Sequence, residues 1–353
     1  MRVAIGIGTS NDDWEAVASY VAEAERLGVD NVWSAESWGH DAVTPLAFLA
    51  GRTSRIKLGS GIMQIAGRTP ANAAMTALTL ASISGDRFIM GLGASGPQVV
   101  EGWHGQRFGQ TPQRLREYID IVRMAIRGDK VAYEGEIYRL PLPGSKEGKA
   151  IRSGAKPHPN IPIYLATLSP KSLEVTGEVA DGWVGTSFIP EHAADVFFNH
   201  VAKGAARAGR SLADIDFHAG GVVAFSDDVD KLIAPRKPGI AFTLGAMGSQ
   251  QHNFYNQAFQ RAGYTDIAKE SQRLWIAGRR DEAAALVPDE MILHTNLLGT
   301  EAMVKERIRV YRAAGITTLR VDPSGRDLKE RLETLGRAVQ LVKEVSAEPV
   351  AAR

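Results

Sequence analysis

The sequence predicts an α/β protein, a (β/α)8 TIM barrel with insertions after its fourth and seventh strands. Three observations support this prediction. Short apolar strand patterns alternate with helical patterns, the connections between them are short, and the pattern contains eight such strands. The alternative is an open doubly wound sheet, but its GxGxxG fingerprint is missing after the first strand, where the chain reads GIGTSN. We therefore expect one barrel domain over residues 1–353.

The first part of the chain alternates strands and helices regularly. Residues 11–13 (Asn-Asp-Asp) offer caps for the first helix, and Gly28 ends it. Thr69 is a suitable cap for the third helix, with Pro70 at its first position. The expected elements are strands over residues 3–8, 31–35, 56–61 and 88–91, and helices over residues 14–27, 44–51 and 70–84.

The second part keeps the alternation but contains two irregular segments. Residues 129–160 hold a predicted hairpin, VAYEG followed by EIYRL, and a loop rich in Pro, Gly and Lys, which is typical of a functional excursion. Residues 228–298 are mostly helical in pattern, so we expect a helical insertion that can form a lid. The other expected elements are a glycine-rich connection over 93–111, strands over 163–166, 182–186, 217–225 and 317–321, and helices over 112–127, from 169, over 191–208, over 300–314 and to about 345.

Composition excludes several classes of function. The 41 basic and 40 acidic residues leave a net charge of +1, which provides no patch for nucleic acid or a membrane surface. The absence of cysteine excludes disulfides, thiolate metal sites and a Cys nucleophile. The N-terminus does not match a signal peptide, and no stretch approaches the roughly 20 apolar residues of a membrane helix. We expect a cytoplasmic protein.

The stretch KLGSGIMQIAGRTP, residues 57–70, is the most informative single segment. It begins as an apolar strand, and Gly59, Ser60 and Gly61 then interrupt the strand pattern. Glycine inside a strand indicates a bulge or the close approach of another group. A strand that deforms at its carboxyl end and leads directly into a helix suits a ligand floor, although an ordinary βα turn has the same pattern.

The carboxyl ends of the strands should form the ligand site of such a barrel. They are rich in Gly, Ser and Thr and contain no His/Asp/Glu cluster at metal-ligand spacing, no GxSxG elbow and no Walker loop. The site therefore suits a bulky planar cofactor that carries a phosphate. The segments at these strand ends are Glu36-Ser37-Trp38, residues 59–64, residues 91–96, Thr167-Leu168-Ser169 and Gly185-Thr186-Ser187.

The start of the helix after strand five is the expected phosphate position. The hydroxyls of Thr167 and Ser169, the free N–H groups and the helix dipole favour an anion there, and Lys171 adds charge. Ser169 can equally serve only as the helix cap, with Pro170 at the first position. Two adjacent loops often share such a site, so Gly185-Thr186 supports the phosphate interpretation.

Glu36 is the most unusual residue at the strand ends. A carboxylate there must be hydrogen-bonded or have a raised pKa, so it could orient a cofactor ring or relay a proton, or it could bind backbone N–H groups in a structural role. Trp103-His104 lies on the loop after strand four and suits either substrate contact or loop packing. Arg68 could pair with cofactor anions or cap a neighbouring element.

These segments together resemble the bacterial-luciferase-like superfamily, and most of all its branch that uses the deazaflavin coenzyme F420. This branch includes methylene-tetrahydromethanopterin reductases and actinobacterial oxidoreductases. The segments that carry the resemblance span nearly the whole chain: VWSAESWGHDAVTPLAFLAGRTSRIKLGSGIMQIAGRTPA, SGDRFIMGLGASGPQVVEGWHG, IPIYLATLSPKSLEVTGEVADGW and LLGTEAMVKERIRVYRAAGITTLRV.

The resemblance implies a non-prolyl cis peptide in strand three that backs the deazaflavin ring. The matching bond is Gly61–Ile62, with Ser60–Gly61 as the alternative. Contacts to the ring and its side chain then fall on Glu36, Ser37, Gln64, Gly93, Ala94 and Ser95, and phosphate contacts on Leu168, Ser169, Gly185 and Thr186. With the candidates from the strand ends, the expected cofactor-binding residues are Glu36, Ser37, Gly61, Ile62, Gln64, Arg68, Gly93, Ala94, Ser95, Gly96, Thr167, Leu168, Ser169, Gly185 and Thr186.

One departure narrows the implied reaction. Sugar-phosphate dehydrogenases of this family place a His after the strand-two acid and a Glu soon after the strand-four Gly-x-Gly, where this chain has Ser37 and Gly96. The resemblance therefore implies another hydride transfer, between the coenzyme's C5 and a small organic substrate, with Glu36, Ser37 and His104 as candidate catalytic residues. The alternatives are an FMN-dependent monooxygenase and a non-catalytic cofactor-binding protein. Relatives of this kind commonly form homodimers, which we expect here.

Overall fold

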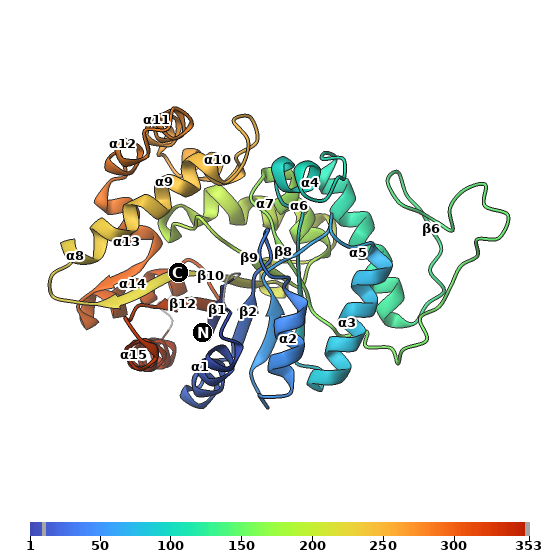
Figure 1. Cartoon of the computed structure of the whole chain (residues 1–353), viewed down its shortest axis with the longest axis horizontal. Coiled ribbons are helices and arrows are strands. Elements are labelled where there is room, and N and C mark those ends of the chain that lie inside the picture. Colours follow the sequence, from blue (N-terminus) through green and yellow to red (C-terminus); the bar gives the residue numbers. More distant parts are fainter. Residues whose placement is uncertain (9–11, 350–353) are drawn as a thin grey trace.

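The computed structural model describes residues 1–8 and 12–349. Within them, eight parallel strands close into a barrel, which confirms the predicted TIM barrel (Figure 1). The barrel closes because the seventh strand pairs with both the sixth and the eighth, and the eighth pairs with the first. These strands are β1 (Arg2–Ile7), β2 (Asn31–Ser34), β3 (Lys57–Ser60), β5 (Phe88–Gly93), β8 (Ile163–Ala166), β9 (Gly182–Val184), β10 (Asp216–Phe225) and β12 (Thr318–Pro323).

Helices cover the outside of the barrel (Figure 1). Of the three proposed caps, Asp13 caps the first helix by accepting the N–H of Ala16, Asp12 is not the cap, and Asn11 lies outside the described residues. Thr69 caps the third and accepts the N–H of Asn72, as predicted. The helices are α1 (Trp14–Leu27), α2 (Val43–Ala50), α3 (Pro70–Ser84), α5 (Thr111–Arg127), α6 (Pro170–Val179), α7 (Asn199–Arg207), α14 (Glu301–Ala313) and α15 (Leu328–Ala347).

Apolar side chains form two clusters. The larger one joins the outer face of the barrel to the helices. The smaller one consists of Ala4, Trp33, Ile89 and Tyr164, which come from four barrel strands. The Trp33 ring requires a glycine beside it, because a Cβ at Gly59 would lie 2.5 Å from a ring carbon. One of the glycines that interrupt strand three therefore makes room for the barrel core.

One carboxylate of α5 holds the hairpin in the excursion between β5 and β8. Strands β6 (Tyr133–Glu134) and β7 (Arg139–Leu140) form the predicted antiparallel hairpin, which projects from the molecule (Figure 1). Glu117 of α5 accepts the backbone N–H groups of Glu136, Ile137 and Tyr138. A short helix, α4 (Pro97–Gly102), also occurs within the predicted glycine-rich connection.

Residues 228–298 are largely helical, as their pattern indicates, and α9 to α12 stand together on the side opposite the hairpin (Figure 1). The pattern missed β11 (Leu297–Gly299), which pairs with the outer end of β10. It also predicted one helix over 191–208, where the chain forms a 3₁₀ turn (Pro190–His192), a π-helical turn (Ala194–Phe198) and α7. Helices of the insertion are α8 (Asp230–Ile233), α9 (Lys237–Ala246), α10 (Phe254–Arg261), α11 (Thr265–Ile276), α12 (Arg280–Ala285) and α13 (Asp289–Thr295).

Remaining short elements are 3₁₀ turns at Leu212–Asp214 and Ala234–Arg236. Among the described residues, no helix combines the length and the apolar composition that crossing a membrane requires.

Candidate active site

Strand three is interrupted at the barrel mouth. It stops at Ser60, resumes as β4 (Met63–Gln64), and the intervening peptide bond Gly61–Ile62, to which the resemblance assigned the cis form, is cis. The interruption brings the chain very close to β5. A Cβ at Gly91 would lie 1.9 Å from the Ser60 carbonyl oxygen, and one at Gly93 would lie 2.8 Å from Cδ1 of Ile62. Two glycines of β5 are therefore necessary for this close contact between strands.

Glu36, directly after β2, is fully engaged. Both of its oxygens accept from the Arg68 guanidinium, at 2.7 and 2.9 Å, and they also accept the N–H groups of Gln64 and Ala42. Burial opposes ionisation, but these four hydrogen bonds outweigh it and hold the pKa of Glu36 below its usual range. The carboxylate therefore stays ionised and fixes Arg68.

Gln64 links this pair to the loop after strand four. Its Nε2 donates to the carbonyls of Glu36, at 3.2 Å, and Ser37, at 2.8 Å, which fixes the orientation of the amide. Its Oε1 must then accept from Nε2 of His104, 2.8 Å away. This bond leaves Nδ1 of a neutral His104 ring as an acceptor. Five predicted residues thus form one network: Glu36, Ser37, Gln64, Arg68 and His104.

The segment after β5 continues along the same edge of the mouth. Ser95 adopts a left-handed conformation, φ +62°, and Gly96 is the extended residue that precedes Pro97 at the start of α4. Trp103, the neighbour of His104, is 66% exposed and makes no part of the network. Strand four therefore brings Gly93, Ala94, Ser95 and Gly96 to the site in a tight turn.

The loop after strand five differs in part from its prediction. The Thr167 hydroxyl is buried against the hydroxyl of Thr176, 2.7 Å away, so it is turned into the fold rather than toward a ligand at the start of α6. Ser169 caps α6 and accepts the N–H of Ser172 at 3.4 Å. Lys171 is exposed and lies 3.7 Å from Glu174. The expected charge from Lys171 is therefore shared with a carboxylate.

Strand six supplies a second close approach near this loop. A Cβ at Gly185 would lie 2.2 Å from the Trp183 ring, and the Gly185 N–H donates to the His218 carbonyl. Thr186 is exposed, and the buried hydroxyl of Ser187 has no hydrogen-bond partner within the described chain.

Arg261, at the end of α10, was not found from the sequence. Its Nη2 donates to the Leu168 carbonyl at 2.6 Å, so the insertion contacts the loop after strand five. Its buried Nε has no hydrogen-bond partner within the described residues, and burial lowers the pKa of Arg261. A buried guanidinium donor without a partner in the described part of the chain, next to the Leu168 carbonyl, is the kind of group that a phosphate oxygen satisfies.

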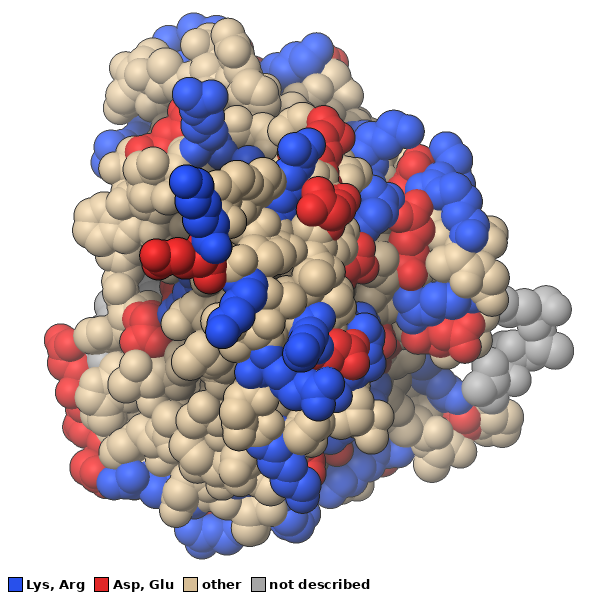
Figure 2. Space-filling model, turned by 90° about the vertical axis from the view of Figure 1, so that its right-hand side faces the viewer, with Lys and Arg blue, Asp and Glu red and all other residues tan. Residues whose placement is uncertain are grey.

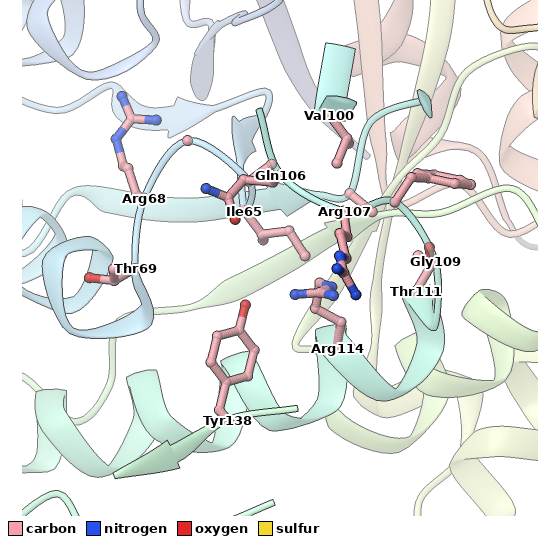
Figure 3. A pocket seen from close by; sticks show the side chains of 14 residues that line it. Ile65, Arg68, Thr69, Val100, Gln106, Arg107, Gly109, Thr111, Arg114 and Tyr138 are labelled. Atoms are coloured by element: carbon pink, nitrogen blue, oxygen red, sulfur yellow. The ribbon is translucent and has the colours of Figure 1, made fainter. Parts of the chain in front are cut away.

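Two cavities lie at this end of the barrel. One, of about 270 Å³, lies beside Arg68 and Ala94 and is shown in Figure 3. The other, of about 440 Å³, lies at the ends of β1, β10 and β12, with Arg236 of the insertion in its wall. Within the described residues no three His, Asp or Glu side chains are grouped so that they could hold a metal ion.

Known proteins with this arrangement can now be compared. The family model described as luciferase-like monooxygenase matches residues 1–318. The chain belongs to this luciferase-like family. A Mycobacterium tuberculosis protein provisionally named a coenzyme F420-dependent oxidoreductase is 42% identical over 309 residues, covering 86% of this chain and 89% of that protein.

Further relatives of this luciferase-like protein include reductases. A 5,10-methylenetetrahydromethanopterin reductase of Archaeoglobus fulgidus is 29% identical over 322 residues, covering 91% of this chain and 93% of its own. Among solved structures, the coenzyme F420 dependent tetrahydromethanopterin reductase of Methanopyrus kandleri superposes with a TM-score of 0.79 at 25% identity, over 96% of this chain and 98% of that one. The chain is therefore an oxidoreductase of the luciferase-like family.

Proposed function

We propose that this protein is an F420-dependent oxidoreductase that transfers a hydride between C5 of the deazaflavin and a small organic substrate. The observation that carries the proposal is the glycine-lined contact at Gly91 and Gly93, where Ser60 and Ile62 press against β5. The contact fixes the interrupted segment with Gly61 and Ile62 against β5, beside the Gln64 network, and this fixed segment would back one face of a planar ring. The names of the relatives support F420 as the ring.

The residues at the mouth fit the whole coenzyme. Gly61, Ile62 and Gly93 would form the floor under the ring. Gln64, Ser37, Ala94, Ser95 and Gly96 would border its edges. Leu168, Ser169, Gly185 and Thr186 would hold the phosphate together with the Nε of Arg261, which is unpaired within the described residues. When bound, the coenzyme supplies the carbon that gives or takes the hydride.

The three candidate catalytic residues divide into two roles. Glu36 would act as a positioning residue, because its oxygens are occupied by four donors and its pKa is held low. His104 would handle a proton at Nδ1, because its Nε2 is committed to Gln64. The Ser37 hydroxyl is the second candidate. The site as a whole would hold ring and substrate face to face and exclude water.

Turnover distinguishes this function from the FMN-dependent alternative, which the description of the family model suggests. The wild-type protein would be mixed with reduced F420 or reduced FMN and a panel of carbonyl and unsaturated compounds, with and without oxygen. The proposal predicts oxidation of reduced F420 that depends on the organic compound and not on oxygen. Oxygen-dependent turnover with reduced FMN would contradict it. Binding of F420 with no hydride transfer across the panel would favour a cofactor-binding protein.

We also propose that the protein acts as a homodimer. Met75 and Ile83 on α3 are 60% and 54% exposed, which leaves apolar side chains on an outer barrel helix. Sedimentation at micromolar concentration would give twice the mass of the chain if this is correct, and a monomer would contradict it.

A further inference from the structure

A cavity of about 270 Å³ beside the Gln64 network is unusually basic. Arg68, Arg107 and Arg114 line it, and no Asp or Glu is among its lining residues. Arg107 and Arg114 direct their guanidinium groups into the same part of the cavity, near the hydroxyl of Tyr138, while Arg68 points away from them (Figure 3). The cavity is therefore a concave surface with positive charge concentrated at one end.

The charge at this end is not neutralised by the protein. Arg68 is paired with Glu36, but neither Arg107 nor Arg114 forms an ion pair with any Asp or Glu of the described chain. Arg114 lies against the Tyr138 hydroxyl. Two guanidinium groups that face one cavity repel each other unless an anion lies between them.

Carboxylates near the cavity are already engaged by other groups. Glu117, one turn along α5 from Arg114, accepts from Gln113 and from three backbone N–H groups of the hairpin. Glu101 accepts the N–H of Phe108, and Glu136 accepts from Gln110. None of these three acids lines the cavity.

Two helices also begin at the cavity wall. Thr69, the cap of α3, and Thr111, the first residue of α5, both line it, and both helices are longer than fourteen residues. The positive ends of their dipoles add to the potential of the arginines. Figure 2 views the molecule from the side that carries these helices, and basic side chains gather near the middle of that face.

We propose that this cavity binds a carboxylate or phosphate group of a small molecule, held between Arg107 and Arg114. The guanidinium fork matches both groups through two parallel hydrogen bonds. Ala94 lines the cavity and is also an expected ring contact, so the remainder of the bound molecule can reach the ring. The inference rests on the proposed function to this extent: it treats the cavity as adjoining the coenzyme site.

Two sources could supply the anion: the substrate, or the phosphate-bearing chain of the coenzyme. The structure favours the substrate, because none of the four expected phosphate contacts, Leu168, Ser169, Gly185 and Thr186, lines the cavity. The substrate would therefore be an organic acid or a phosphate ester.

Calorimetry of the full chain with inorganic phosphate and with succinate tests the site without the coenzyme. Arg107→Gln and Arg114→Gln should each weaken binding of one or both anions at least about tenfold. Arg152→Gln is the matched control, because Arg152 is exposed on the same excursion and lies outside the cavity. It should change affinity less than about twofold. Thermal melting of each variant verifies folding. The proposal would be overturned if the wild-type protein bound neither anion at about 10-fold above the millimolar concentrations that are ordinary in cells. It would also be overturned if the two variants bound both anions as tightly as wild type does.

Coenzyme titrations of the same variants separate the two sources. If the substrate supplies the anion, both variants bind F420 within about twofold of wild type. If the coenzyme's chain supplies it, both variants lose F420 affinity and inorganic phosphate competes with F420. Either outcome supports the anion site. Anion binding by a wild-type protein that fails to bind F420 would count against the proposed function and leave the anion site standing.

Discussion

The polar groups on two sides of the barrel mouth differ in how completely they are paired. At strands two to four, Glu36 accepts four hydrogen bonds and Gln64 uses both ends of its amide. At strands five and six, the Nε of Arg261 and the hydroxyl of Ser187 are buried without partners in the described chain. The first side is a complete hydrogen-bond network that positions its neighbours, whereas the second keeps these buried donors without partners, which we propose a bound ligand would satisfy.

Breaking the pair of Glu36 and Arg68 should have the largest effect on stability. Arg68→Met leaves Glu36 buried without its charged partner and should cost about 4 kcal/mol of unfolding free energy near neutral pH. Urea denaturation measures the change. The control is Arg52→Met, because the pair of Arg52 and Glu15 is exposed and should contribute below about 1 kcal/mol. Equal losses of unfolding free energy in the two variants would show that the pair of Glu36 and Arg68 stabilises the fold no more than an exposed ion pair does.

The same pair predicts a dependence on pH. The folded pKa of Glu36 lies below its ordinary value of 4.5, so the stability that its ionisation contributes is present above about pH 4.5 and is lost as pH falls through the folded pKa. The difference between wild type and Arg68→Met should therefore narrow in acid. A difference that stays constant from pH 7 to pH 3 would contradict the assignment.

Filling the glycine contact should have the next largest effect. In Gly91→Ala the new methyl group would collide with the Ser60 carbonyl, which is backbone and cannot rotate away, so a loss of about 3 kcal/mol is expected. Gly102→Ala is the control, since nothing lies within 4 Å of its added Cβ. Urea midpoints compare the two, and a Gly91→Ala protein as stable as the control would refute the close contact.

Changes at strands five and six should lower the affinity for F420 rather than the stability of the fold. Arg261→Gln removes the guanidinium at the expected phosphate position and should weaken F420 binding about tenfold, with little change in the melting temperature. Lys171→Gln, in the first turn of α6 but exposed and near Glu174, should change the affinity for F420 less than about twofold. Fluorescence titration gives both constants. Similar behaviour of the two variants would remove Arg261 from the site.

The smallest effect is expected from replacing the residue that is proposed to handle the proton. His104→Gln should lower turnover about tenfold while leaving F420 affinity within about twofold, because general acid–base help is lost and the ring contacts remain. The pH profile of turnover should lose one ionisation. An unchanged profile would assign the proton to Ser37 or to water.

The sequence predicted what local pattern controls. The strand positions, the caps at Thr69 and Ser169 and the bond Gly61–Ile62 could be identified because each depends on neighbours in the chain or on a family motif. The five network residues could also be named in advance, but not the bonds among them. Gln64 and His104 are 40 positions apart, and only the closed barrel brings their loops together.

The missed features depend on distant contacts or on side-chain direction. Arg261 lies 93 positions from Leu168, and nothing in its helical pattern marks it as a ligand group. Thr167 stands at a strand end, where one residue decides between the mouth and the interior, and it turns toward Thr176. The strand β11 is three apolar residues long, too short for periodicity to distinguish it from the insertion helices.

The central claim is that the interrupted segment of strand three, packed on the glycines of β5, backs a deazaflavin ring. It is tested most directly by titrating the wild-type protein with F420 and with FMN. Absorbance and fluorescence of each ring report binding. The account predicts micromolar affinity for F420 and at least about tenfold weaker affinity for FMN. It also predicts loss of F420 binding in Gly93→Val, whose branched side chain would collide with Ile62 and displace the segment that backs the ring. Tighter binding of FMN than of F420, or unchanged F420 affinity in Gly93→Val, would contradict it.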